Sequence, residues 1–321
     1  MSLPTYDDVR AAQRLLGPTP IWHTPTQTSR TLGEIAGVDD LRLKLELFQK
    51  TGSFKPRGAF CSIAALSPAD RERGVIAVSA GNHAQAVAYA AALAGTRSVV
   101  VTWKTASQVK LDAAAAYGAE VLRLGDTPLE SFEAMYRVRD ERGLVLIHPF
   151  DDPHLLAGQG TVGLEVLEDV PDVGTIVVPV GGGGLLSGIA IALRAARPGV
   201  RIVGVEPEGA PTLTRALAAG EPVSLDAIST IADGLSAPFA GQLTHEAVRD
   251  LVDDIVLVSD AEILQAMKLL ALRAKVVAEP AAAAGLAALI AGRVAPAPGP
   301  VVVVISGGNV AADLVARALT A

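Results

Sequence analysis

Short runs of β-branched and other apolar residues recur along this chain and alternate with longer stretches of helical character. Eight such runs predict buried strands, over residues 75–78, 98–102, 121–124, 145–147, 175–180, 201–205, 255–258 and 301–305. Helices are predicted between them, over residues 84–93, 107–117, 129–141, 160–167, 185–196, 260–275 and 281–291. Strands that alternate with helical crossovers indicate parallel sheets with helices on both faces.

The predicted strands fall into two groups along the chain. Four precede Phe150 and four follow it, so we expect two sheets of four strands each. A cleft between two such sheets is the natural place for a small-molecule ligand. The hydrophobic pattern therefore predicts an α/β protein with two mostly parallel, twisted sheets.

Four consecutive glycines, Gly181 to Gly184, lie between the predicted strand 175–180 and the predicted helix 185–196. Their N–H groups carry no side chains in front of them and lie at the positive end of a helix dipole, which suits a phosphate group. A dinucleotide site uses a similar turn, with the next strand here ending in Glu206. However, Ser187 stands where that fingerprint requires its third glycine. A phosphorylated small molecule is expected, and the glycines alone do not distinguish which one.

Further polar segments follow predicted strands or precede helices. Residues 79–85 follow the strand 75–78, and residues 306–309 follow the strand 301–305. Because ligands bind at the carboxyl ends of parallel strands, these segments are candidate ligand contacts. Lys55 precedes Pro56, which suits the first turn of a helix with Ser53 or a nearby residue as its cap. A lysine whose pKa is lowered can form a Schiff base with an aldehyde.

Composition narrows the class of partner. The chain has 321 residues and a formal net charge of -7, which argues against nucleic acid as the main partner. The single cysteine, Cys61, allows no internal disulfide and suits a reducing compartment. Residues 1–10 contain no apolar core of a signal peptide. The apolar stretch 175–193 is interrupted by Pro179 and the four glycines, so we expect no membrane-spanning helix there.

Eight motifs, in order, resemble the fold type II pyridoxal-phosphate enzymes, in the branch of threonine/serine dehydratases (threonine ammonia-lyases) and serine racemases. The resemblance runs from about Thr19 to Asn309. The motifs are Ser53-Phe-Lys-Pro-Arg-Gly-Ala59, Ser79-Ala-Gly-Asn-His-Ala-Gln85, Gly158-Gln-Gly-Thr161, Gly181-Gly-Gly-Gly-Leu185, Glu206-Pro207, Thr230-Ile-Ala-Asp-Gly234, Glu279-Pro280 and Ser306-Gly-Gly-Asn309.

This resemblance implies a role for each matching residue. Lys55 would bind the cofactor through an imine and later move the substrate's α-proton. The cofactor-binding set would be Phe54, Lys55, Asn82, Gly181, Gly182, Gly183, Gly184, Leu185, Glu279 and Ser306. The loop that binds the substrate carboxylate would be Ser79, Ala80, Gly81, Asn82 and His83. A neutral Ser306 at the ring nitrogen would favour prompt elimination over transamination.

The resemblance also implies an architecture similar to the β subunit of tryptophan synthase, with the cofactor in a cleft between two domains. Residues 1–67 and 149–321 would form the large cofactor-binding domain. Residues 68–148 would form the small domain that carries the substrate loop.

Two departures from the family pattern modify these expectations. In the racemase branch the position of Ala80 holds a second serine, which transfers a proton on the opposite face of the substrate. Elimination needs proton transfer on the lysine face only. Many relatives bind a divalent metal through positions that are here Glu206, Ala210 and Thr212. Since a neutral threonine replaces an acid, we expect this metal site to be weakened or lost.

The expected activity is therefore dehydration and deamination of a hydroxy amino acid, L-threonine to 2-oxobutyrate or L-serine to pyruvate, with release of ammonia. Serine racemase and 3-hydroxyaspartate dehydratase are the alternatives, followed by a dinucleotide-binding oxidoreductase and a non-catalytic binding module. The resemblance further implies a cytoplasmic homodimer or homotetramer. The chain ends soon after Ser306, so control by a C-terminal regulatory domain is not expected.

Overall fold

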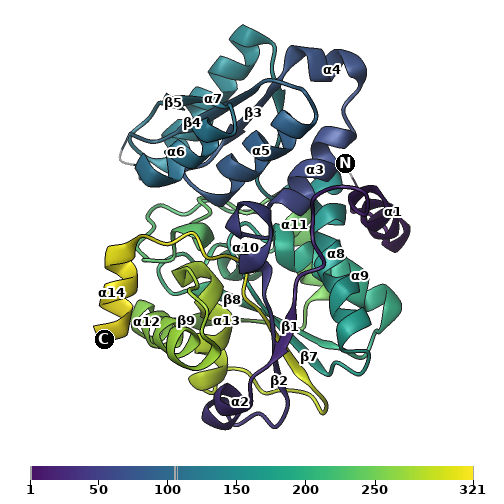
Figure 1. Cartoon of the computed structure of the whole chain (residues 1–321), viewed down its shortest axis with the longest axis vertical. Coiled ribbons are helices and arrows are strands. Elements are labelled where there is room, and N and C mark those ends of the chain that lie inside the picture. Colours follow the sequence, from purple (N-terminus) through teal and green to yellow (C-terminus); the bar gives the residue numbers. More distant parts are fainter. Residues whose placement is uncertain (1, 105, 107, 321) are drawn as a thin grey trace.

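Two sheets organise the structure, a computed structural model that describes residues 2–104, 106 and 108–320 (Figure 1). The strands of the larger sheet are β1 (Thr26–Thr28), β2 (Leu41–Lys44), β7 (Thr175–Pro179), β8 (Arg201–Pro207), β9 (Asp254–Val258) and β10 (Val301–Val304). Those of the smaller sheet are β3 (Val75–Val78), β4 (Ser98–Thr102), β5 (Glu120–Arg123) and β6 (Val145–Leu146). Within the described residues the strand orders are β1-β2-β10-β7-β8-β9 and β5-β4-β3-β6. All neighbouring strands are parallel except β1 and β2, which confirms the predicted α/β architecture.

Helices cover both sheets, as Figure 1 shows with the smaller sheet uppermost. The smaller sheet is accompanied by α4 (Pro68–Arg73), α5 (Asn82–Leu93), α6 (Gln108–Ala116) and α7 (Pro128–Arg142). The remaining helices are α1 (Tyr6–Leu16), α2 (Arg30–Ala36), α3 (Pro56–Ala64), α8 (Pro153–Asp169), α9 (Gly184–Ala196), α10 (Thr212–Ala219), α11 (Gln242–Leu251), α12 (Asp260–Leu269), α13 (Pro280–Ile290) and α14 (Ala312–Thr320). Short helical turns are η1 (Glu46–Phe48), η2 (Lys50–Gly52), η3 (Asp233–Leu235) and the π-helical η4 (Leu270–Ala274). None of the helices in these ranges is both long and apolar enough to cross a membrane.

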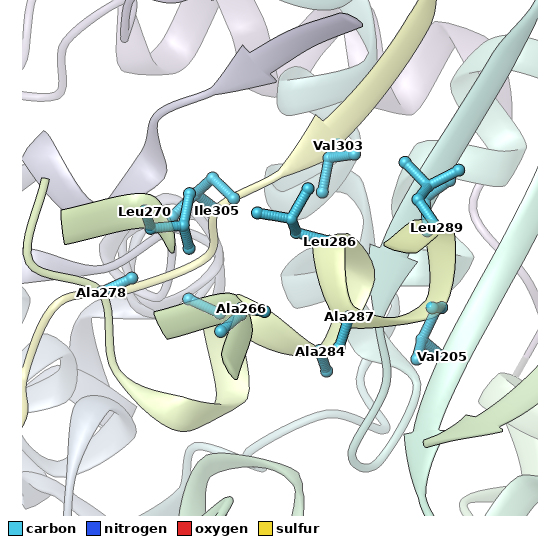
Figure 2. Packing of buried hydrophobic residues seen from close by; sticks show 14 of the residues in the cluster. Val205, Ala266, Leu270, Ala278, Ala284, Leu286, Ala287, Leu289, Val303 and Ile305 are labelled. Carbon is cyan, nitrogen blue, oxygen red and sulfur yellow. The ribbon is translucent and has the colours of Figure 1, made fainter. Parts of the chain in front are cut away.

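The core of the larger sheet is apolar on both faces because its parallel strands are covered by helices. All four residues of β10 are valines, and all are buried. On one face, Leu286 of α13 packs in the same cluster as Val303 of β10 and Val205 of β8 (Figure 2). On the other face, Val302 and Val304 pack in a cluster with residues of α8 and α9. β10 is therefore the central strand against which helices of both layers pack.

The predicted count of four strands in each sheet is wrong for the larger sheet, which has six. The two strands that the pattern missed are β1 and β2. β1 is a polar, three-residue strand, and β2 alternates leucines with charged residues over only four positions. Strands this short give too few periods to be recognised from a sequence, and tertiary pairing with β10 determines that β2 is a strand.

Several helix boundaries also differ from prediction. Pro56 begins α3 as expected, and among the cap candidates Lys55 occupies the N-cap position, while Ser53 is extended and bridges to Gly307. The single helix expected over residues 260–275 is instead α12 followed by the turn η4, which ends where Lys275 adopts a φ of 62°. The helix predicted over residues 107–117 is observed from Gln108, and Ser107 lies outside the described residues.

A buried ionic network connects α3 to η1 and α8. Arg57, on α3, is only 1% exposed. Its guanidinium donates to both carboxylate oxygens of Glu46 at 2.8 Å, and to those of Glu165 at 2.6 and 2.9 Å. Glu165 belongs to α8 and Glu46 to η1, so one side chain joins three separate segments.

A second buried cation balances the charge of this network. The Nζ of Lys44, on β2, lies 2.7 Å from Glu165 and donates to the carbonyl oxygen of Thr24 at 2.7 Å. The buried members are thus two carboxylates, Glu46 and Glu165, and two cations, and Lys44 also lies 3.4 Å from the partly exposed Asp169. Loss of one member would leave a charge buried without its partner, which is far more costly than loss of an exposed pair.

We expect Arg57→Met to lower the free energy of unfolding by about 3–5 kcal/mol, because both carboxylates lose their main partner in the interior. Arg30→Met is the matched control, since Arg30 pairs with Glu34 at 2.9 Å on the surface with side-chain exposures of 90% and 62%. This control should cost less than about 1 kcal/mol. Urea unfolding of the apoproteins measures both changes. Equal losses of unfolding free energy in the two variants would contradict the claim that losing one member of the buried network is especially costly.

Candidate active site

A cavity lies where strands of both sheets end. β3 ends before Ser79, β7 ends before the glycine turn, and β10 ends before Ser306. The cavity volume is about 160 Å³, whereas one water molecule needs only about 10–15 Å³ measured in the same way. All the residues named as site candidates from the sequence line this cavity: Phe54, Lys55, Ser79, Ala80, Gly81, Asn82, His83, Gly181, Gly182, Gly183, Gly184, Leu185, Glu279 and Ser306. The metal positions named from the sequence, Glu206, Ala210 and Thr212, do not line it.

Lys55 enters the cavity from the start of α3. Its Nζ donates a hydrogen bond to the carbonyl oxygen of Pro149 at 2.7 Å, across 94 residues of sequence. Burial lowers the pKa of the Lys55 amine to about 8, although the negative charge of Glu279 acts in the opposite direction. An amine with this pKa is partly neutral near physiological pH, so it can attack an aldehyde and accept a proton.

The glycine turn, residues 181–184, packs closely against neighbouring residues such as Phe150 and Leu235. A Cβ atom on Gly182 would overlap the ring of Phe150, and Gly183 has a φ of 86°, which favours glycine. Gly184 begins α9, and among the described residues no backbone acceptor is found for the N–H groups of residues 181–184. Unpaired N–H groups at a helix N-terminus provide a site for an anion such as phosphate.

The segment after β3 forms a second group of backbone donors at the N-terminus of α5. The N–H of Gly81 donates to the Ser79 hydroxyl at 3.0 Å, which shapes the turn. The ring of His83 donates through Nε2 to the carbonyl oxygen of Ile147 at 2.9 Å. Burial lowers the pKa of His83 to about 3, with a contribution from the charge of Lys55, so this imidazole is neutral.

Glu279 and Ser306 complete the wall near Lys55. The Nδ2 of Asn82 donates to Oε1 of Glu279 at 2.7 Å, which connects the start of α5 to the start of α13. The carbonyl oxygen of Ser306 accepts from the N–H of Phe54 at 3.1 Å, which holds the segment before Lys55 against the end of β10. The Ser306 side chain is buried and lines the cavity.

Sequence reasoning missed part of the cavity wall. The carbonyl of Pro149 and the loop 233–238 carry no recognisable pattern of their own, although Asp233 and Gly234 belong to a motif already noted. Trp103, Pro128 and Phe132 add an apolar wall from the side of the smaller sheet. These residues contribute through tertiary position, for which the chain offers no local signal.

The metal candidates have a different structural role. Glu206 accepts the N–H of Leu213 at 2.7 Å through one oxygen, and the N–H of Thr214 at 2.9 Å and its hydroxyl at 2.6 Å through the other. Both oxygens therefore satisfy the N-terminal turn of α10. Ala210 is buried beside this turn. Within the described ranges no group of three or more His, Cys, Asp or Glu side chains is arranged to hold a metal ion.

Comparison with known proteins identifies the class. The family described as pyridoxal-phosphate dependent enzyme matches residues 17–307. The L-threonine ammonia-lyase of Thermotoga maritima is 42% identical over 313 residues, which cover 98% of this chain and 77% of that protein. A serine racemase of Oryza sativa is 42% identical over 308 residues, covering 94% of this chain and 90% of that protein.

A solved structure of maize serine racemase has a similar fold, with a TM-score of 0.92 and 39% identity over 99% of this chain and 97% of that chain. The chain belongs to the pyridoxal-phosphate dependent enzymes. More narrowly, it belongs to the fold type II lyases and racemases that include threonine ammonia-lyase and serine racemase.

The cavity fits this cofactor. An amine with a lowered pKa suits the cofactor's aldehyde, and N–H groups without backbone acceptors suit its phosphate. Glycines packed against Phe150 and Leu235 keep that wall free of side chains. The donor set is therefore appropriate to pyridoxal phosphate.

The nucleophilicity of Lys55 should rise with a midpoint near pH 8, because the buried amine loses its proton at lower pH than an ordinary lysine, whose pKa is 10.5. Competitive acetylation of the apoprotein at a series of pH values, with mass spectrometry of the Lys55 peptide, measures this midpoint. Acetylation of free lysine amide in the same tube is the reference. Glu279→Gln removes the charge that raises the pKa and should lower the midpoint further. A wild-type midpoint near pH 10.5 would contradict the lowered pKa of Lys55.

Gly182→Ala should weaken binding of pyridoxal phosphate to the apoprotein by about 10-fold or more, because the added methyl displaces Phe150 and moves the glycine turn. Gly199→Ala is the matched control, since a Cβ there would meet open space. Absorbance titration with pyridoxal phosphate gives both dissociation constants. Similar affinities for the two variants would show that close packing behind the turn does not control cofactor binding.

Proposed function

We propose that this protein eliminates the β-hydroxyl group of L-threonine and L-serine, giving a 2-oxo acid and ammonia. The observation that carries the proposal is the pair of groups that Lys55 and Ala80 bring to the cavity. Lys55 offers an amine with a lowered pKa, which suits proton transfer. Ala80 offers only a methyl group at the position where racemisation would need a serine hydroxyl. The identity to an L-threonine ammonia-lyase supports it.

The proposed roles follow from the donors that each residue offers. Lys55 holds the cofactor's aldehyde carbon and then accepts the α-proton of the substrate. Residues 181–185 bind the phosphate through N–H groups, while the amide of Asn82 donates to the ring oxygen and the hydroxyl of Ser306 meets the ring nitrogen. Phe54 would pack near the ring, and Glu279 would lie near its edge. Once bound, the cofactor supplies an extended π-system that accepts the electrons of the broken Cα–H bond.

The substrate carboxylate is proposed to bind residues 79–83. This segment opens α5, where backbone N–H groups and the helix dipole attract an anion without a charged side chain. The neutral His83 adds no charge to this position. The carboxylate is thereby fixed at one end of the cavity while the amino group faces Lys55.

Racemisation is the second candidate, since serine racemases are among the relatives. It requires groups that transfer protons on both faces of the α-carbon. Ala80 has no proton to transfer. The specific observation in this chain therefore favours elimination over racemisation.

The cavity chemistry disfavours 3-hydroxyaspartate as the substrate. A second carboxylate would require an additional cation, but within the described lining residues Lys55 is the only lysine and no arginine is present. Asp233 and Glu279 line the same cavity and would repel a second negative charge. The apolar wall of Trp103 and Phe132 is compatible instead with the methyl group of threonine.

The domain division is part of the same proposal. Residues 68–148, which include the smaller sheet, would form the substrate-loop domain, and residues 1–67 and 149–321 the cofactor domain. We further propose a homodimer or homotetramer that acts in the cytoplasm. Size-exclusion chromatography with light scattering tests the assembly.

Steady-state assays of the purified holoenzyme with threonine, serine and 3-hydroxyaspartate test the activity through release of 2-oxo acid. We expect kcat/KM for threonine and serine to exceed that for 3-hydroxyaspartate by about 100-fold or more. Lys55→Ala is the inactive reference. Preferred turnover of 3-hydroxyaspartate, or serine racemisation faster than pyruvate release, would refute the proposal.

Ala80→Ser should raise the ratio of serine racemisation to elimination by about 10-fold or more, because it adds a hydroxyl able to transfer a proton. Ala281→Ser adds a hydroxyl elsewhere in the cavity wall and should leave this ratio unchanged. Chiral chromatography of serine together with a pyruvate assay measures both products. An unchanged ratio in Ala80→Ser would contradict the claim that the missing hydroxyl at position 80 is what favours elimination over racemisation.

A further inference from the structure

Asn309 follows β10 and lies outside the cavity lining, yet it contacts two parts of the site. Its Nδ2 donates to the carbonyl oxygen of Thr51 at 2.7 Å and to Oδ1 of Asn82 at 2.8 Å. Both hydrogens of the Asn309 amide nitrogen are therefore used. One side chain thus joins the turn that leads to Lys55, the start of α5 and the end of β10.

These contacts determine which end of the Asn82 amide faces each neighbour. Oδ1 of Asn82 accepts from Asn309, and Nδ2 of Asn82 donates to Glu279 at 2.7 Å. A flipped amide would place an oxygen against the Glu279 carboxylate and an NH₂ group against the NH₂ group of Asn309. Because an amide nitrogen has two hydrogens, one N–H of Asn82 remains for an acceptor in the cavity.

Backbone on both sides leaves little room for these amides to move. A Cβ on Gly52, where φ is 72°, would lie 2.7 Å from Oδ1 of Asn309. A Cβ on Gly307 would lie 2.5 Å from Oε1 of Glu279. Thr51, whose carbonyl accepts from Asn309, has a φ of 61°, a conformation disfavoured for a β-branched residue. The surrounding structure thus holds this turn in an uncommon conformation where Asn309 contacts it.

We propose that Asn309 is a positioning residue that orients Asn82 so that an N–H group, and not an oxygen, meets the ring oxygen of pyridoxal phosphate. The inference rests on the proposed role of Asn82 in cofactor binding. Asn309 itself touches neither cofactor nor substrate in this arrangement. Its effect is transmitted through the amide of Asn82, with Glu279 fixing the other end.

The test compares two probes, pyridoxal phosphate and its analogue with hydrogen in place of the ring hydroxyl. In the wild type we expect the analogue to bind the apoprotein about 10-fold more weakly, because it offers Asn82 no acceptor. In Asn309→Asp, which has oxygens in place of the donor, this ratio should fall to about one. Asn309→Ala should lower the ratio less far, because Glu279 still accepts from Nδ2 of Asn82 in that variant. Thermal unfolding of each apoprotein establishes that it is folded.

Gln49→Ala is the matched control. Gln49 accepts from the N–H of Lys50 and pairs with the backbone of Trp22, so its loss loosens the same loop without touching Asn82. This variant should keep the wild-type ratio. A 10-fold ratio that persists in folded Asn309→Asp and Asn309→Ala, or a wild-type ratio of one, would overturn the inference. Failure of the wild type to bind pyridoxal phosphate at all would instead refute the proposed function.

Discussion

The hydrogen-bonded ion pairs of Arg57 are the interaction on which the position of α3 depends. The planar Arg57 guanidinium makes paired hydrogen bonds with two buried carboxylates, Glu46 of η1 and Glu165 of α8. A planar group bonded at several points resists rotation of the helix about its own axis as well as sliding along it. Because Lys55 lies two residues earlier, the same bonds limit where its amine can be. Apolar replacements for buried ion pairs often preserve stability, so we interpret the contribution of this network as fixed geometry rather than net stabilisation.

The cavity provides anion-binding groups mainly through backbone. The glycine turn and the start of α5 each present N–H groups at a helix N-terminus, from the larger and the smaller sheet respectively. Backbone donors hold an anion without adding a cation that would lower the pKa of Lys55 further. The site can therefore accept a phosphate and a carboxylate while the charge near the amine is set by Glu279. Anion binding through backbone N–H groups needs no excess of cationic side chains, so it is compatible with a chain whose overall charge is negative.

Much of this arrangement could be predicted from the sequence, for identifiable reasons. The strands 75–78 and 98–102 were predicted at their observed bounds because continuous apolar runs mark buried parallel strands. The glycine turn is recognised because glycines after a predicted strand are a local pattern, and Lys55 because the motif over residues 53–59 resembles that of a known family. The partners of Arg57 and the carbonyl that receives the Lys55 amine could not be predicted, because each pairing joins segments far apart in the chain. The orientation of the Asn82 amide similarly depends on a residue 227 positions later.

The place of β10 in the larger sheet has a consequence for how the protein is made. β2 pairs with β1 and β10, and β10 pairs with β2 and β7, so the last strand to be synthesised lies between strands made much earlier. Until residues 301–304 leave the ribosome, β1 and β2 lack the strand through which they pair with the other described strands of their sheet. Because β10 is made last and lies inside the sheet, the nascent chain depends on late pairing between strands far apart in sequence. Such pairing is slow, and the apolar edges of the earlier strands stay unpaired until it occurs. A chain truncated before β10 would lack both the strand that joins the halves of the sheet and the Ser306 end of the cavity.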